Sequence, residues 1–153
     1  MNVRLIAVGK VREPYVAQAC ADFRKRLAPY GKYEEIEVRA SDAGTPDQAM
    51  REEGDRILRL MKPGEPVWLL ERTGTELSSV ELSYRLRALE NSGQSRLTLV
   101  VAGTFGASPQ MQARATFSWS LSKLTLLHEW ARMLVLEQLY RAAKIARNEA
   151  YHH

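Results

Sequence analysis

The apolar residues of this chain follow two spacings, one typical of buried strands and the other of amphipathic helices. Residues 2–9 form a nearly continuous apolar run, as in a strand that is buried on both faces. Polar and apolar residues alternate around Ile36 and Val38, which indicates an edge strand. The pattern predicts strands at residues 2–9, 32–38, 66–70, 97–101 and 117–121.

Helical spacing alternates with these strands. A first helix is expected at residues 13–27, and the next two begin with capping boxes at Thr45 and Ser78. A fourth helix follows Ser108, and the longest spans residues 128–148. One face of this last helix is expected to carry Ala131, Leu134, Gln138, Ala142 and Ile145.

This order of elements predicts a single α/β domain over residues 1–153, with a mostly parallel sheet and helices on both faces. Ligands of such sheets bind beyond the carboxyl ends of the strands. We therefore expect a site among the loops at residues 71–74, 102–106 and 122–127.

Two of these loops have compositions that suit a ligand. Gly103 follows a buried strand and allows a close approach of the backbone or a positive φ, although a plain strand-to-helix turn explains it equally well. The loop at 122–127 holds three leucines, which need a cover. An adenine and a ribose would cover them, and so would the domain itself or a partner subunit.

Composition narrows the class of protein. No apolar run reaches the roughly 18–20 residues of a membrane span, and we expect no signal peptide. Cys20 is the only cysteine, so we expect a reduced, cytoplasmic setting and no cysteine-rich metal site. The net charge is +4, and residues 104–149 hold six basic side chains against three acidic ones. This basic third suits a polyanion such as RNA, or is simply a solvated face.

Several polar residues near the end of the chain are candidates for chemistry. His128 begins the longest helix, and Arg132 and Arg141 lie along it. Tyr151 and His152 belong to the closing Tyr-His-His sequence. A helix cap, ordinary Glu137–Arg141 pairing and an inert tail are the structural alternatives.

Longer segments resemble one family. LIAVGKVREPYVAQACADFRKRLAPY at the start, LVVAGTFGAS, SWSLSKLTLLHEWARMLVLEQLYRAAKI and the closing AYHH are similar to the RlmH family of pseudouridine N3-methyltransferases. These enzymes modify the 23S RNA of the bacterial large ribosomal subunit, and the resemblance covers the whole chain.

The resemblance implies a SPOUT-type fold with a C-terminal trefoil knot, a homodimer, and S-adenosyl-L-methionine (AdoMet) as methyl donor, without a metal. By position, the cofactor contacts fall on Leu70, Ala102, Gly103, Leu121, Ser122, Lys123, Leu124, Thr125 and Leu126. The family usually has glycine at 102, and it has lysine or arginine where His153 stands here. Ala102 is expected to be harmless if its φ is negative.

The implied reaction needs a base for the N3 proton of pseudouridine. His152 is the first candidate and His128 the second, with Tyr151 holding the nucleobase. Arg132 or Arg141 would stabilise charge on the uracil oxygens. The substrate is expected to be the assembled ribosome. A SPOUT methyltransferase with another RNA target and a non-enzymatic ribosome-binding module are the rival interpretations.

Overall fold

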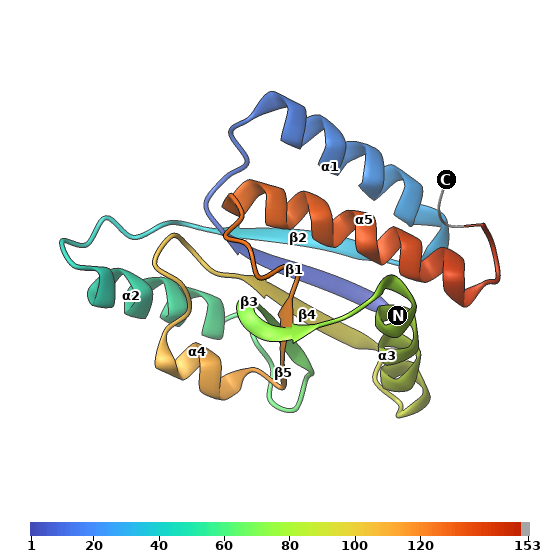
Figure 1. The fold of residues 1–153 in the computed structure, drawn as a ribbon. Helices are drawn as coiled ribbons and strands as arrows, with labels where there is room; N and C mark the ends of the chain where they lie inside the picture. The colour runs from blue at the N-terminus through green and yellow to red at the C-terminus, as the bar shows by residue number, and fades with distance from the viewer. Residues whose placement is uncertain (151–153) are drawn as a thin grey trace.

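Five parallel strands form the centre of the fold, between two layers of helices (Figure 1). The computed structural model describes residues 1–150. Its elements are β1 (Asn2–Val8), α1 (Pro14–Leu27), η1 (Ala28–Tyr30), β2 (Tyr33–Val38), α2 (Pro46–Leu58), β3 (Val67–Glu76), α3 (Ser79–Asn91), β4 (Arg96–Val101), α4 (Pro109–Arg114), β5 (Phe117–Ser120) and α5 (His128–Ala146). The expected α/β class, with helices on both faces of a parallel sheet, is confirmed.

The strand order is β2-β1-β4-β3-β5, so the predicted edge position of β2 is confirmed. Successive residues of a strand point to opposite faces, and β1 divides its side chains accordingly. Leu5 and Ala7 belong to the core under α1, α3 and α5, whereas Ile6 packs with Ile57 and Met111 under α2 and α4. The sheet therefore has two separate cores.

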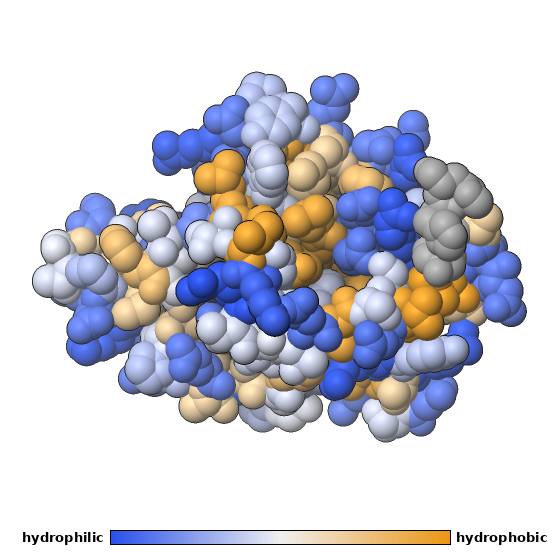
Figure 2. All heavy atoms as spheres, viewed as in Figure 1, coloured by the Kyte–Doolittle hydropathy of each residue, from blue (hydrophilic) through white to orange (hydrophobic). Residues whose placement is uncertain are grey.

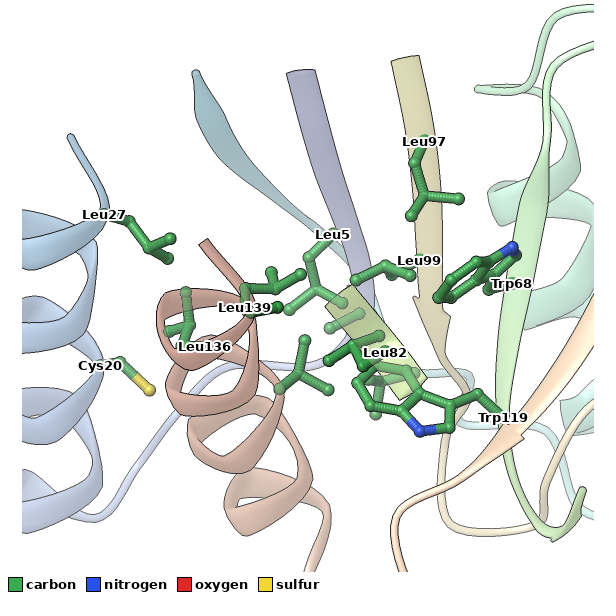
Figure 3. Close-up of a cluster of buried hydrophobic side chains, with 14 of the residues drawn as sticks. Leu5, Cys20, Leu27, Trp68, Leu82, Leu97, Leu99, Trp119, Leu136 and Leu139 are labelled. Carbon is green, nitrogen blue, oxygen red and sulfur yellow. The ribbon is translucent and has the colours of Figure 1, made fainter. Parts of the chain in front are cut away.

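The core under α1, α3 and α5 is the larger one (Figure 3). Leu139 of α5 points at Leu5 of β1, Leu136 lies on the side of α5 that faces α1, and the indole rings of Trp68 and Trp119 pack edge to face with centroids 6.1 Å apart. Because α5 packs against both α1 and α3, it is buried on a broad face. The predicted face is wrong in part. Ala142 is buried, but the other fully buried positions are Arg132, Val135, Leu136 and Leu139.

The third strand departs from the prediction at its carboxyl end. Residues 71–74 were expected to form a loop, yet β3 continues to Glu76. Leu70 and Thr75 both face Trp119 of β5, so the four residues between them bulge out of the ladder. A Cβ on Gly74 would lie 2.6 Å from the carbonyl oxygen of Ser118, which is why the bulge needs glycine.

Side-chain caps fix two helix starts as predicted. The Ser78 hydroxyl accepts from Glu81 N–H at 3.0 Å, and the Glu81 carboxylate accepts from Ser78 N–H at 2.9 Å. The Thr45 hydroxyl accepts from Gln48 N–H at 3.2 Å, which is one half of the expected box. Within residues 1–150, no helix has the length and apolarity to cross a membrane.

Candidate functional site

A cavity of about 180 Å³ lies beside the bulge of β3, near the carboxyl ends of β4 and β5. This is the sheet edge at which ligands of parallel α/β folds bind. All the expected cofactor residues except Lys123 line it. They are Leu70, Ala102, Gly103, Leu121, Ser122, Leu124, Thr125 and Leu126. Three segments that are distant in sequence therefore meet at one cavity.

The turn after β4 forms one wall. Gly106 N–H donates to the Gly103 carbonyl at 3.0 Å and closes the turn. The φ of Gly103 is not positive, so the conformational reason that we considered for this glycine does not apply. A Cβ at 103 would overlap the Glu53 carboxylate and lie 3.2 Å from Val8. Gly103 is thus required because its neighbours approach closely.

Ala102 also lines the cavity. Among residues 1–150 the only non-glycine residue with a positive φ is Asn148. The backbone at 102 therefore accepts alanine without strain. The methyl group packs against the core that contains Ile6 and Ile57.

The loop before α5 forms the opposite wall. The Ser120 hydroxyl donates to the carbonyls of Arg72 and Ser122 at 2.9 and 3.0 Å, which ties this loop to the bulge of β3. The Ser122 hydroxyl accepts from Leu124 N–H at 3.0 Å. Leu124 is 73% exposed although it borders the cavity. The loop is held by hydrogen bonds, and two of its three leucines, Leu124 and Leu127, are exposed.

Lys123 lies apart from the other residues of this loop. Its side chain is almost fully exposed, and its ammonium lies 3.9 Å from a Glu76 carboxylate oxygen. It does not line the cavity.

His128, the first residue of α5, lines the cavity as well. It makes no side-chain cap to the helix, whose N-cap is Leu127. The capping interpretation of this histidine is therefore not supported, and the residue borders the space that a ligand would occupy.

Arg132 lies one turn after His128 on α5, and its guanidinium forms ion pairs and a hydrogen bond with residues of β2 and the turn after β1. Only 4% of it is exposed. Its guanidinium contacts Glu37 at 2.9 Å and Glu35 at 3.4 Å, and donates to the Gly9 carbonyl at 3.2 Å. Both acids belong to β2, so Arg132 joins α5 to the edge strand and to the end of β1. It is not among the residues that line the cavity.

The carboxylate of Glu35 affects other buried groups nearby. Burial, and then the charge of Glu35, raise the pKa of the Cys20 thiol. The same two causes raise the pKa of the Tyr33 phenol, whose hydroxyl donates to Glu35 at 3.0 Å. Cys20 and Tyr33 are therefore neutral, and the Glu35 charge is balanced by Arg132 and by Arg24 at 3.1 Å.

The remaining candidates lie toward the end of the chain. Arg141 pairs with Glu137 at 2.8 Å, the ordinary spacing on one helix face. Tyr151, His152 and His153 lie outside the described residues.

Ala146 ends α5 beside a second, larger cavity of about 410 Å³ at the amino ends of β1 and β2. The expected site lies at the other end of the strands, their carboxyl ends.

The structure adds residues to the site that sequence reasoning missed. Glu71 and Arg72 line the cavity from the bulge of β3, and Val101, Gly106, Trp119 and Ala131 complete its wall. The loop predictions at 71–74 and 102–106 covered Glu71, Arg72 and Gly106, and no sequence signal indicated the other three. No cluster of His, Cys, Asp and Glu suited to a metal ion occurs in residues 1–150.

Apolar side chains lie on the surface beside the cavity at the carboxyl ends of the strands. In the space-filling view they gather over the start of α5 and the loop before it (Figure 2). Leu127 is 62% exposed, and Trp130 donates its indole N–H to the Tyr15 hydroxyl at 3.1 Å on the surface. Such a patch is typical of an interaction surface.

Comparison with known proteins gives a consistent result over the full length. The family described as "Predicted SPOUT methyltransferase" matches residues 1–152. A protein of Gloeobacter violaceus named ribosomal RNA large subunit methyltransferase H is 40% identical over 153 residues, covering 100% of this chain and 99% of the relative. Proteins of the same name from Carboxydothermus hydrogenoformans and Acetivibrio thermocellus are 36% and 37% identical, with 99% of each chain covered.

Proposed function

This chain belongs to the SPOUT methyltransferases, in the RlmH family, and from that premise we propose that it methylates N3 of a pseudouridine in 23S rRNA with AdoMet as donor. The observation that carries the proposal is the cavity at the carboxyl edge, lined by eight of the nine expected cofactor residues. The methyltransferase class follows from family membership, and the substrate and the donor are our inference.

The cavity fits the chemistry of AdoMet. Its leucines and Trp119 offer an apolar slot for a purine, and the backbone of the two walls offers N–H and C=O groups for its edge. The volume of about 180 Å³ is below the roughly 300–1,000 Å³ usual for small-molecule sites. We therefore infer that a second chain or the RNA covers part of the cofactor.

When bound, AdoMet supplies a sulfonium methyl group that is already activated for displacement. The chain's own residues then have to orient the nucleobase and accept one proton from N3. We assign proton acceptance to His152, with Tyr151 holding the nucleobase, and keep His128 as the second candidate because it lines the cavity. No metal is needed for this chemistry.

Arg141 is the better candidate for stabilising charge on the uracil oxygens, and because it lies about 20 Å along α5 from His128, we propose that it does so in the cavity of a partner subunit. The Arg132 guanidinium is buried and already bound by two carboxylates and a carbonyl, so it is not available to a substrate. We propose that Arg132 acts by fixing α5 against β1 and β2, which positions His128.

The last described residues lie far from the cavity of their own subunit. Helix α5 has 19 residues and therefore spans about 28 Å between His128 and Ala146. Glu149 is held at the far end, where its carboxylate accepts from Tyr30 at 2.8 Å and contacts Lys144 at 3.4 Å. The residues after Ala150 span at most about 10 Å. We infer that Tyr151 and His152 serve the cavity of a partner subunit.

A homodimer would supply that tail and cover the apolar patch at Tyr15, Leu127 and Trp130. We further propose the trefoil knot that the family implies, a single domain over 1–153, and action in the cytoplasm. The net charge of +4 is low for a protein that binds free RNA, so we propose the assembled ribosome as substrate.

Mass spectrometry of 23S rRNA from a strain that lacks this protein tests the target. We expect one pseudouridine to lose its N3-methyl group and to regain it when the gene is restored. Loss of methylation at another nucleotide would favour a different RNA target. Unchanged methylation, together with no AdoMet binding in calorimetry, would favour a non-enzymatic ribosome-binding module.

A further inference from the structure

A buried carboxylate lies behind the glycine turn of the cavity. Glu53 of α2 is 6% exposed, and its Oε2 accepts from Ser41 N–H at 2.9 Å. Its Oε1 is buried and has no hydrogen-bond partner within residues 1–150. The proposed reaction gives this residue no role.

The unpaired oxygen is directed at the turn that lines the cavity. A Cβ on Gly103 would overlap Glu53 Oε1, so this oxygen lies against the Gly103 backbone. Gly103 lines the cavity and Glu53 does not. The turn therefore separates the carboxylate from the space for the ligand.

An acceptor that is buried without a donor destabilises the state in which it occurs. Such groups are rare in native proteins and call for an explanation. The turn itself contains donors, because Gly103, Thr104 and Phe105 all have backbone N–H groups. Because Glu53 Oε1 already contacts the Gly103 backbone, a change in the orientation of one of these N–H groups is enough for the hydrogen bond to form.

We propose that Glu53 is a positioning residue of the cofactor site, whose Oε1 accepts a backbone N–H of the 102–106 turn when that turn closes on AdoMet. The inference rests on the proposed function, since it takes AdoMet as the ligand. Glu53 would then link the segment around Ser41, helix α2 and the cofactor turn. It touches neither the methyl group nor the RNA.

The substitution Glu53→Gln keeps the shape of the side chain and removes its charge. We expect AdoMet to bind about tenfold more weakly in calorimetry, since a charge-assisted hydrogen bond is replaced by a weaker one. The melting temperature of the ligand-free variant should equal or exceed that of the wild type, because an unpaired charge is lost. Glu52→Gln is the matched control, because Glu52 bonds the Ser41 hydroxyl instead of the turn.

Hydrogen exchange gives a readout that does not depend on activity. In the wild type, AdoMet should slow exchange at the amides of residues 103–105, and this protection should be lost in Glu53→Gln and kept in Glu52→Gln. Equal AdoMet affinity and equal protection in Glu53→Gln and wild type would overturn the inference. If the wild type itself does not bind AdoMet, both the proposed function and this inference are overturned.

Discussion

At the scale of single residues, the site depends on the absence of a side chain at 103. Gly103 has a φ that other residues accept, and only its neighbours exclude a Cβ. Ala102 borders the same cavity with a side chain and without backbone strain. Two adjacent positions that share a wall therefore differ sharply in what they tolerate.

The pair of substitutions Gly103→Ala and Ala102→Gly tests this difference. We expect Gly103→Ala to lower the free energy of unfolding by about 1–3 kcal/mol, as overpacking does, and to weaken AdoMet binding at least tenfold. Ala102→Gly should change AdoMet affinity less than threefold. Calorimetry and thermal unfolding measure both effects. Equal affinities in the two variants would contradict the close-packing explanation.

The sequence predicted most of the residues that line the cavity, mainly through the resemblance and the expectation of a site at the carboxyl edge. It did not predict Glu53 or the pairing of Arg132. Glu53 looks like any acid on an amphipathic helix, and its contact with Gly103 spans fifty positions. Arg132 and Glu35 are 97 positions apart, so no local pattern shows that they meet.

At the scale of elements, α5 runs from the carboxyl ends of the strands to their amino ends. It begins with His128 at the site cavity and ends with Ala146 at the second cavity. Helical periodicity predicted its existence and start, but only part of its buried face. The reason is that α5 contacts α1, α3 and the sheet, so one narrow stripe does not describe its burial.

The capping box of α3 gives a prediction about pH. Hydrogen bonds from Ser78 lower the pKa of Glu81 below its ordinary value. A group with a lowered pKa in the folded state stabilises it above the unfolded pKa of about 4.3, and this contribution is lost as the pH falls through the folded value. Glu81→Ala should therefore lower the melting temperature at pH 7 and have a shrinking effect below pH 4. A difference that stays constant down to pH 3 would contradict this.

At the scale of the whole molecule, element order and parallel class were predictable, but strand order was not. The order β2-β1-β4-β3-β5 places β5 at an edge beside the bulge of β3, and this neighbourhood creates the cavity. Sequence periodicity carries no information about which strand lies beside which. It also gives no distance between the end of α5 and the cavity.

That distance predicts that each site uses two subunits. A mixture of a tail variant, His152→Ala, with a pocket variant, Gly103→Val, should recover activity that neither variant has alone. Random exchange of subunits should give about a quarter of the wild-type activity, because half of the dimers are mixed and each has one complete site. Sedimentation should show that both variants remain dimeric. An inactive mixture of dimeric variants would mean that the tail serves its own subunit.

The proposed methyl transfer from AdoMet to 23S rRNA is measured most directly with purified protein. Ribosomes from a strain that lacks the protein are incubated with AdoMet carrying a tritium-labelled methyl group. We predict that label appears at N3 of a single pseudouridine in 23S rRNA, and that intact ribosomes accept far more label than naked rRNA. No label in any ribosomal RNA, under conditions in which the protein is folded and saturated with AdoMet, would contradict the account.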